Sequence, residues 1–238
     1  MACLIRERGQ GVSTIRVAID GPAGAGKSTV AKALAQRLGL QYVDTGAMYR
    51  AVAWAAIQRN IPLEDEERIS ELATSLEFSF TFDKGQLCVS VNGIEVTPYL
   101  RTPEVSRGAS VVAQYKGVRQ ALGEQQKRLA QLPGIVMDGR DIGSRIMPNG
   151  DLKVYLTASP EVRARRRWEE IGGSNQGLSL AKVAEEIRRR DQADQQRKSD
   201  PLVPAADAVV IDTSTLSLAQ VVDRLVHYCE ALCRTRAT

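Results

Sequence analysis

The chain has 238 residues, of which 43% are apolar and 25% charged, an ordinary balance for a globular protein with one sizeable core. Its 32 basic and 28 acidic side chains give a net charge of +4, weaker than the dense basic face typical of nucleic-acid-binding proteins, so that class is disfavoured. No apolar run is long enough to span a bilayer, which predicts no membrane partner. Residues 1–14 lack an apolar stretch and are expected to be a disordered tail rather than a secretory signal, which favours a cytoplasmic protein.

Strand and helix patterns alternate from residue 15 onward, which predicts an α/β fold with a mainly parallel sheet and helices on both faces. Five core strands are expected, at residues 15–19, 40–43, 134–138, 152–156 and 208–211. Gly39 is expected to end the first helix, and Thr45 and Ser217 are expected to be the N-caps of later helices. The helices are expected at residues 29–38, 45–59, 63–76, 103–113, 115–131, from 160 onward, 180–196 and 218–233.

A different pattern interrupts this alternation. Residues 76–82 and 87–91 alternate between apolar and polar side chains with a period of two, and Asn92-Gly93 is a strong hairpin signal. We therefore expect a small antiparallel insert at about residues 78–99, whose role could be packing alone.

The segment Gly21–Ser28 reads G-P-A-G-A-G-K-S, a complete match to the P-loop pattern G-x-x-x-x-G-K-[ST] between a strand and a helix. Its glycines let the backbone approach an anion, and the N–H groups at the helix N-terminus point at phosphates. Lys27 can reach the β- and γ-phosphates, and the Ser28 hydroxyl can ligate Mg²⁺. We expect a nucleoside triphosphate to contact Gly21, Pro22, Ala23, Gly24, Ala25, Gly26, Lys27, Ser28 and Thr29.

Two further clusters follow the ends of predicted strands. One is Asp44–Arg50, which reads D-T-G-A-M-Y-R, and the other is Asp138–Gly143, which reads D-G-R-D-I-G. Ligands of open α/β sheets bind at the carboxyl ends of the strands, so these clusters are expected to share an edge with the P-loop. Asp138 and Asp44 are both candidates for holding Mg²⁺ through water.

A third cluster is a set of arginines on two predicted helices. Arg163, Arg166 and Arg167 share one helical face by their spacing, and more arginines follow the glycine-rich break at residues 172–177. Charge runs on helices are often only solvated faces. Two helices with inward arginines around a flexible loop nevertheless favour a lid, at about residues 160–190, that closes over phosphates.

Histidine and cysteine chemistry is disfavoured by the same sequence. His227 is the one histidine and lies near the C-terminus, which excludes most Ser-His-Asp and Cys-His mechanisms. Cys229 and Cys233 are one helical turn apart but complete no zinc-ligand set, so we interpret them as packing residues in a reducing cytosol. The chemistry must then depend on Lys, Arg, Asp and a metal ion.

These blocks together resemble the bacterial cytidylate kinases. The resemblance rests on the P-loop, the segments Asp44–Arg50 and Asp138–Gly143, the hairpin insert, and Pro201–Ala208 followed by Ile211–Thr213. It covers about residues 15–232, and other nucleoside monophosphate kinases share the P-loop but not the later blocks. It implies a single P-loop kinase domain over residues 15–238, with a five-stranded parallel sheet, the insert as a nucleotide-binding subdomain, and a helical lid.

The resemblance also implies an activity, which is transfer of the γ-phosphate of ATP to CMP or dCMP with the help of Mg²⁺. Thr45, Arg50 and Arg140 match positions that hold the acceptor phosphate, although relatives often carry Ser at position 45. Ser110, Arg119 and Asp141 match positions that read the cytosine edge. The full acceptor set is Thr45, Tyr49, Arg50, Ser110, Arg119, Arg140, Asp141, Arg190, Asp194 and Arg197. The catalytic residues would be Lys27, Arg140 and Arg190, and the lid would add Arg163 and Arg167 to the ATP site.

The chemistry of the acceptor agrees with this interpretation. A phosphate monoester with a second pKa of about 6 is largely dianionic near neutral pH, so it needs no general base. The difficulty is to bring two polyanions together, which requires cations and exclusion of water. We expect small-molecule nucleotides as partners and a monomeric protein, since nothing in the sequence suggests an obligate interface.

A nucleic-acid-binding protein is disfavoured, as stated above. Two other kinds of alternative remain open. Another P-loop kinase with a small acceptor, such as a shikimate or dephospho-coenzyme A kinase, would not need the cytosine-reading residues or the insert. A P-loop ATPase or GTPase would need a segment that positions a catalytic water, or a guanine-reading N-K-x-D stretch. Neither feature is visible in the sequence.

Overall fold

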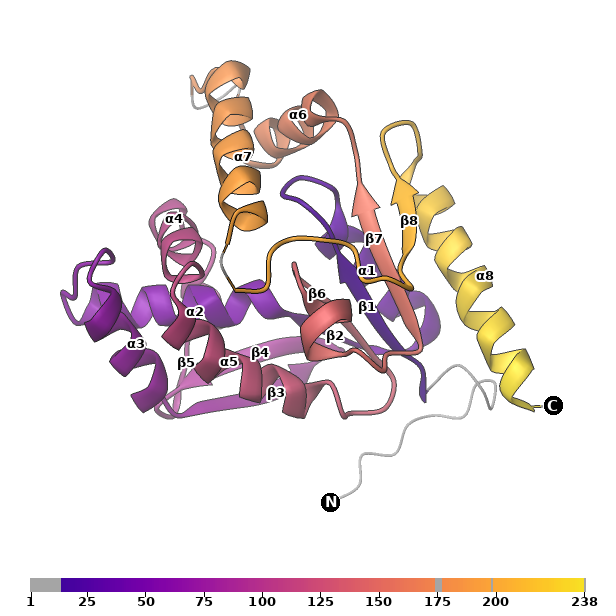
Figure 1. Ribbon diagram of the computed structural model, residues 1–238, viewed down its shortest axis with the longest axis horizontal. Helices are drawn as coiled ribbons and strands as arrows, with labels where there is room; N and C mark the ends of the chain where they lie inside the picture. Colours follow the sequence, from indigo (N-terminus) through magenta and orange to yellow (C-terminus); the bar gives the residue numbers. More distant parts are fainter. Residues whose placement is uncertain (1–13, 174–176, 198, 238) are drawn as a thin grey trace.

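The computed structural model describes residues 14–173, 177–197 and 199–237 (Figure 1). Within these ranges, eight strands form one sheet in the order β3-β4-β2-β6-β1-β7-β8, with β5 paired to β4. The strands are β1 (Arg16–Asp20), β2 (Gln41–Asp44), β3 (Phe78–Asp83), β4 (Gln86–Val91), β5 (Ile94–Glu95), β6 (Ile135–Asp138), β7 (Leu152–Thr157) and β8 (Val209–Asp212). Residues 1–13 of the predicted tail and residues 174–176 of the predicted break at 172–177 lie outside the described residues.

The centre of the sheet confirms the predicted α/β class. Strands β2, β6, β1, β7 and β8 are mutually parallel, and they are the five strands that the sequence pattern indicates. The hairpin of β3 and β4 is antiparallel. It joins the sheet where Gln86 pairs in parallel with Tyr42, so the insert extends the edge of the main sheet.

Helices cover both faces of the sheet, as Figure 1 shows. They are α1 (Lys27–Leu38), α2 (Thr45–Gln58), α3 (Glu66–Ser75), α4 (Pro103–Val112), α5 (Lys116–Leu129), α6 (Pro160–Glu170), α7 (Leu180–Gln195) and α8 (Leu218–Ala237). The structure also contains two short helical turns. The 3₁₀ turn η2 (Thr97–Tyr99) precedes α4, and the π-helical turn η3 (Ile142–Ile146) lies between β6 and β7.

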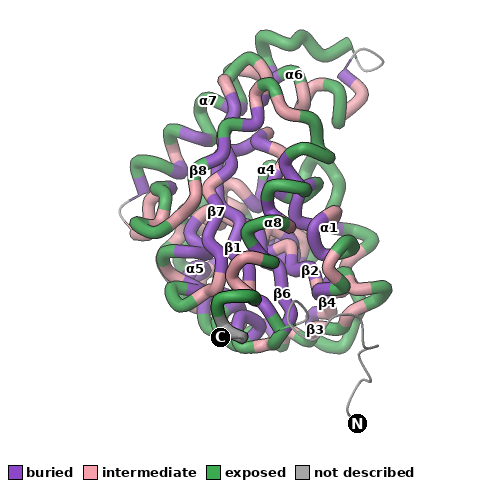
Figure 2. The backbone as a smooth tube through the Cα atoms, turned by 90° about the vertical axis from the view of Figure 1, so that its right-hand side faces the viewer, coloured by how far each residue is buried: buried purple, intermediate pink, exposed green. Residues whose placement is uncertain are grey.

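The core divides into two layers because alternate residues of each strand face opposite sides. Ala18 and Met137 pack with α2, α3, α4 and α5, whereas Val17 and Ile19 pack with α1 and α8 through residues such as Leu34. These side chains are almost completely buried, and Figure 2 shows the strands along the buried centre of the molecule. Burial on both faces explains why the strands are continuous apolar runs.

The helix ends mostly agree with the sequence. Gly39 ends α1 with a φ of 69°, and Ser217 accepts a hydrogen bond from the N–H of Gln220 at 3.2 Å. The prediction that Thr45 caps α2 is wrong. Asp44 is the N-cap, with its carboxylate accepting from the N–H of Ala47 at 3.2 Å, and Thr45 is the first residue inside the helix.

The π-helical turn η3 was not predicted, because a residue distant in sequence organises it. Asp20, at the end of β1, accepts hydrogen bonds from the N–H groups of Ile142 at 2.8 Å and Gly143 at 2.7 Å. Burial raises the pKa of Asp20 to about 6 although these two N–H groups act in the opposite direction. The contact joins the end of β1 to the segment that follows β6.

Helices α6 and α7 lie together beyond the carboxyl end of β7 (Figure 1). A buried ion pair between Arg163 of α6 and Asp191 of α7 joins them. Both side chains also bond the backbone of Ala23 in the P-loop, Arg163 at the carbonyl oxygen and Asp191 at the N–H, each at 3.1 Å. The helical pair is therefore anchored at its base to the P-loop.

None of the helices in the described part of the chain combines the length and the apolar character that crossing a membrane requires.

We predict that Asp191→Ala lowers the free energy of unfolding by about 3–5 kcal/mol, because it leaves the buried Arg163 guanidinium without its carboxylate partner. Denaturant unfolding measures this change. Glu185→Ala is the matched control on the same helix, because Glu185 forms an exposed pair with Arg188, and its midpoint should not move. Equal midpoints for the two variants would contradict the anchoring role of Asp191.

Candidate active site

The P-loop has the conformation that phosphate binding requires. Gly21, Gly24 and Gly26 have φ angles of 146°, 74° and 84°, in the region that favours glycine. A Cβ at Gly21 would lie 2.0 Å from the carbonyl oxygen of Leu156, and one at Gly24 would lie 2.7 Å from that of Arg163. The backbone of Leu156 and Arg163 therefore packs closely against the P-loop, and α1 begins directly after the loop.

Lys27 is buried at the start of α1, and its Nζ donates to the carbonyl oxygen of Pro22 at 2.7 Å. Burial and the positive charge of Arg140 lower the pKa of Lys27 well below its usual range. Arg190 is a further cation that acts in the same direction. A bound phosphate would reverse this effect, because its negative charge favours the protonated amine.

Ser28 and Asp138, the predicted magnesium ligand and one of the two predicted acidic candidates, lie side by side at the P-loop. The Ser28 hydroxyl donates to Oδ2 of Asp138 at 2.8 Å, and the Tyr42 hydroxyl donates to Oδ1 at 2.8 Å. Burial and then the charge of Asp44 raise the pKa of Asp138. The described residues contain no group of three or more His, Cys, Asp or Glu side chains that could hold a metal ion.

The segment after β2 holds its groups close to Asp138. Thr45 is buried, and its hydroxyl donates to the backbone oxygen of Asp138 at 2.7 Å. Arg50 forms an ion pair with Asp44 at 2.6 Å between Nη2 and Oδ2. That pair occupies Asp44, which leaves Asp138 as the better of the two magnesium candidates.

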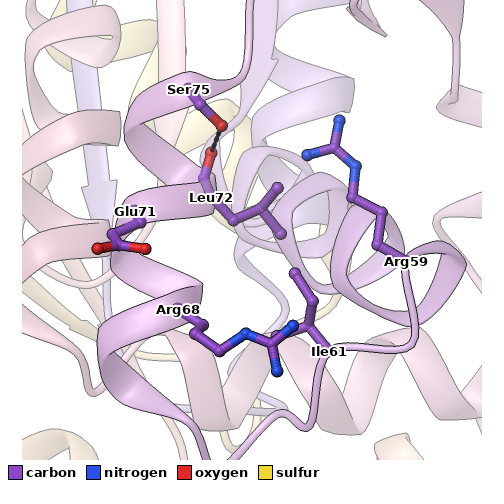
Figure 3. A pocket seen from close by; sticks show the side chains of 6 residues that line it. All are labelled: Arg59, Ile61, Arg68, Glu71, Leu72 and Ser75. Atoms are coloured by element: carbon purple, nitrogen blue, oxygen red, sulfur yellow. Dashed lines mark hydrogen bonds between the residues drawn. The ribbon is translucent and has the colours of Figure 1, made fainter.

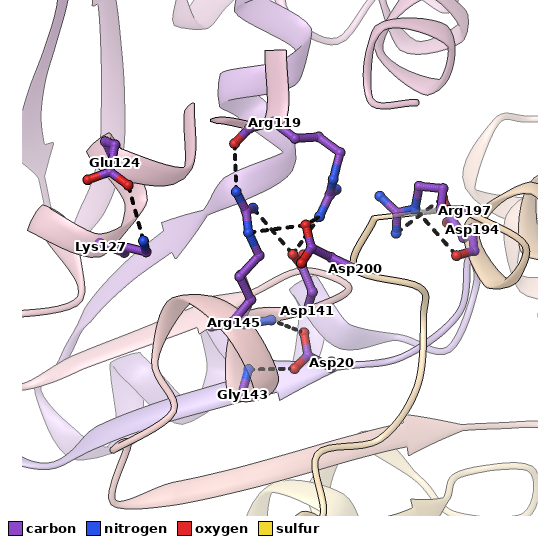
Figure 4. Close-up of polar contacts among 11 residues, drawn as sticks. Asp20, Arg119, Glu124, Lys127, Asp141, Gly143, Arg145, Asp194, Arg197 and Asp200 are labelled. Carbon is purple, nitrogen blue, oxygen red and sulfur yellow. Dashed lines mark hydrogen bonds and ion pairs between the residues drawn. The ribbon is translucent and has the colours of Figure 1, made fainter. Parts of the chain in front are cut away.

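The residues predicted to read cytosine lie on three different elements. Arg119 of α5 is buried and pairs with Asp141 at 2.7 Å between Nη2 and Oδ2 (Figure 4). Ser110 is half-buried on α4, with its hydroxyl 3.4 Å from the carbonyl oxygen of Ser106. Two charged residues that the sequence analysis missed, Arg145 and Asp200, also contact this pair. They belong to no motif that would have drawn attention to them.

Of the remaining acceptor residues, Arg140 follows β6, and Arg190, Asp194 and Arg197 lie at the end of α7 and just after it. Arg140 pairs with Asp194 at 2.9 Å between Nε and Oδ2. Against the effect of burial, the Arg140 guanidinium lowers the pKa of Asp194. Arg190 is exposed as a residue, but desolvation of its guanidinium and the charge of Arg140 lower its pKa to about 10. Arg197 is buried, with its Nη2 3.8 Å from Oδ1 of Asp194.

The arginines of the predicted lid differ in their surroundings. Arg163 is buried against the P-loop as described above, and Arg167 pairs with Glu170 at 2.9 Å near the surface. Arg166, which shares their helical face, donates to the backbone oxygen of Thr213 at 2.7 Å. The roles of Arg163 and Arg167 toward ATP stay predictions.

Buried donors without partners gather in this region. Among the described residues, the buried side-chain atoms with no hydrogen-bond partner are the Tyr49 hydroxyl, Nε of Arg50, Nε of Arg119, Nε2 of Gln126 and Nη2 of Arg197. All except Gln126 belong to the predicted acceptor set. Native structures rarely leave such groups unpaired.

A surface groove of about 340 Å³ lies elsewhere, at the end of α2 and along α3 (Figure 3). It is lined by Arg59, Ile61, Arg68, Glu71, Leu72 and Ser75. None of the predicted site residues lines this groove, so it is not the predicted nucleotide site.

Comparison with known proteins identifies a family and several relatives that match most of the chain. The cytidylate kinase family model matches residues 17–231. A cytidylate kinase of Desulfitobacterium hafniense (strain Y51) is 50% identical over 89% of this chain and 91% of its own length. A cytidylate kinase of Bacillus subtilis (strain 168) is 44% identical over 91% of this chain and 96% of its own length.

The fold also occurs in distant structures. An uncharacterised protein from Eubacterium ventriosum ATCC 27560 matches with a TM-score of 0.52 at 11% identity, over 91% of this chain and 98% of its own. That likeness shows the fold alone. The family model and the curated relatives cover nearly all of the described chain, and the protein therefore belongs to the cytidylate kinase family.

Proposed function

We propose that the protein transfers the γ-phosphate of ATP to CMP or dCMP, forming ADP and CDP or dCDP. The observation that carries this proposal is the group of buried, unpartnered donors on Tyr49, Arg50, Arg119 and Arg197, in a chain that also holds a complete P-loop. The names of the related enzymes support cytidylate as the acceptor. The protein acts as a monomer on small-molecule nucleotides.

The acceptor phosphate binds among Arg50, Arg140 and Arg190 in this proposal. As a dianion it attacks the γ-phosphorus directly, so no residue must remove a proton. Burial strengthens each electrostatic contact, and the cations cancel the repulsion between the two nucleotides. Lys27 stabilises the charge that develops on the transferred phosphoryl group.

Asp138 and Ser28 would hold Mg²⁺ in the nucleotide complex, and the ion would supply charge neutralisation of the β- and γ-phosphates. The Tyr42 hydroxyl fixes the orientation of the Asp138 carboxylate through its own hydrogen bond at 2.8 Å. Helices α6 and α7 act as the lid, anchored to the P-loop through Asp191, and closure excludes water from the γ-phosphate.

Cytosine binds beside Arg119 and Asp141. The exocyclic amine of cytosine is a donor, and the Asp141 carboxylate accepts from it, whereas uracil presents an oxygen at the same position. The Arg119 Nε is a buried donor that can meet an acceptor on the base. The donor and the acceptor together favour cytosine over uracil.

A coupled assay of ADP production across a panel of acceptors tests the proposed function. CMP and dCMP should be phosphorylated with ATP and Mg²⁺, and UMP, AMP and shikimate should be poor acceptors. ATP hydrolysis that is equally fast with and without CMP would contradict the proposal and favour an ATPase. A preference for shikimate would favour another P-loop kinase.

We predict that Lys27→Ala lowers kcat by several orders of magnitude while the fold survives, because the variant loses the cation that contacts the transferred phosphoryl group. Steady-state kinetics measures the loss, and circular dichroism checks the fold. Lys127→Ala is the control, since Lys127 is exposed and pairs with Glu124 on the same helix. An insoluble Lys27→Ala protein would instead indicate a structural role.

We also predict that Asp141→Ala raises the KM for CMP by about 5- to 150-fold, the equivalent of about 1–3 kcal/mol, while the KM for ATP changes little. The variant loses the acceptor for the cytosine amine. Asp223→Ala on α8 is the matched control and should leave both constants unchanged. An equal rise of the two KM values in Asp141→Ala would rule out a role in reading the base.

A further inference from the structure

Four charged side chains form a closed cluster beside the proposed nucleobase site. Arg119 and Arg145 provide two positive charges, and Asp141 and Asp200 provide two negative charges, which we call the charge quartet (Figure 4). Arg119 lies 2.7 Å from Asp141 and 2.9 Å from Asp200, both measured from Nη2 to Oδ2. Arg145 lies 3.5 Å from Asp141 and 3.1 Å from Asp200. Each cation therefore contacts both carboxylates.

Asp200 reaches this cluster from a different part of the fold. It follows α7, and its φ of 51° is in the left-handed region, which is unusual for a residue other than glycine. The N–H of Leu202, two residues later, donates to the backbone oxygen of Asp194 at 2.9 Å. Asp194 pairs with Arg140, so the segment that carries Asp200 is fixed to the acceptor-phosphate site as well.

The contacts of Asp141 explain how the Asp200 carboxylate affects the oxygen atom that would bind the base. Both guanidinium groups approach its Oδ2 atom, and no described residue donates a hydrogen bond to its Oδ1 atom. Oδ1 is therefore available for a donor on the base. Without Asp200, Arg119 and Arg145 would face one carboxylate alone, and two cations would compete for both of its oxygens.

Arg145 is fixed by more than its charge. Its Nη2 donates to the backbone oxygen of Arg119 at 2.9 Å, so it remains next to Asp141 in the absence of Asp200. Its guanidinium also packs against Gly123 of α5, where a Cβ would lie only 2.6 Å from Nη2. Because the Arg145 guanidinium is held in place, a nearby carboxylate such as that of Asp200 must balance its positive charge.

We propose that Asp200 is a positioning residue for nucleobase selection. Its carboxylate binds Arg119 and Arg145, which leaves Oδ1 of Asp141 free to accept from the exocyclic amine of cytosine. The proposal rests on the proposed function, because it takes CMP as the acceptor. It adds a selectivity determinant on the segment after the lid helix α7, outside the predicted acceptor set.

The test is the ratio of kcat/KM for CMP to kcat/KM for UMP in the full-length enzyme. Asp200→Asn keeps the size of the side chain and removes its charge, and the ratio should fall on the order of 3- to 10-fold, through the KM for CMP. The kcat with CMP and the KM for ATP should change less than about 2-fold. Asp207→Asn is the matched control, since Asp207 follows in the same segment and pairs with Lys153 instead.

A charge-compensating variant separates positioning from folding. Asp200→Asn combined with Arg145→Gln leaves one cation and one carboxylate, so the ratio should recover toward the wild-type value even if thermal stability falls further. A residue with a merely structural role would give additive losses in the double variant. An unchanged ratio in Asp200→Asn, or no recovery in the double variant, would overturn the proposal.

Loss of the positioning role and loss of the proposed function give different experimental results. If the wild-type enzyme phosphorylates CMP and the ratio is insensitive to Asp200, only the positioning role is wrong. If the wild-type enzyme does not phosphorylate CMP, the proposed function fails first, and the role of Asp200 fails with it. If Asp200→Asn does not fold, the double variant still reports whether the balance of charge controls the ratio.

Discussion

The structure depends on positive charge that is buried before any ligand binds. Lys27 lies inside the protein near Arg140, and burial together with that neighbouring cation lowers its pKa. Arg190 is exposed as a residue, but desolvation of its guanidinium and the charge of Arg140 lower its pKa as well. Such an arrangement is unfavourable in a free protein, and anions placed between the cations would make it favourable. Two nucleotides in contact supply the required anions.

The fold brings these cations together through the parallel order of its strands. The P-loop follows β1, Asp44 ends β2, and Asp138 ends β6, so all three lie at the carboxyl edge of the sheet. Contacts across this edge then fix the loops, as when Asp20 accepts from two N–H groups of η3. Asp191 does the same for the helical pair by bonding the N–H of Ala23. Other carboxylates pair with the cations themselves, as Asp44 does with Arg50 and Asp194 with Arg140.

The sequence predicted the elements that depend on local patterns and missed those that depend on distant contacts. The continuous apolar strands and the glycine loop are local, and both were confirmed. The assignment of Thr45 as a cap was wrong because Asp44 competes for the same role and its carboxylate reaches the helix N-terminus. Arg145 and Asp200 were missed because they are far apart in the chain and only the folded structure pairs them. The substrate roles came from a family resemblance, and the structure adds the charge balance around them.

The central claim is that two anionic nucleotides bind side by side among these cations. Calorimetric titration with a ligand that joins adenosine and cytidine through five phosphates tests it directly. The account predicts that this ligand binds at least about 100-fold more tightly than ATP or CMP, and that either nucleotide displaces it. Binding no tighter than that of ATP, with no competition from CMP, would contradict the account.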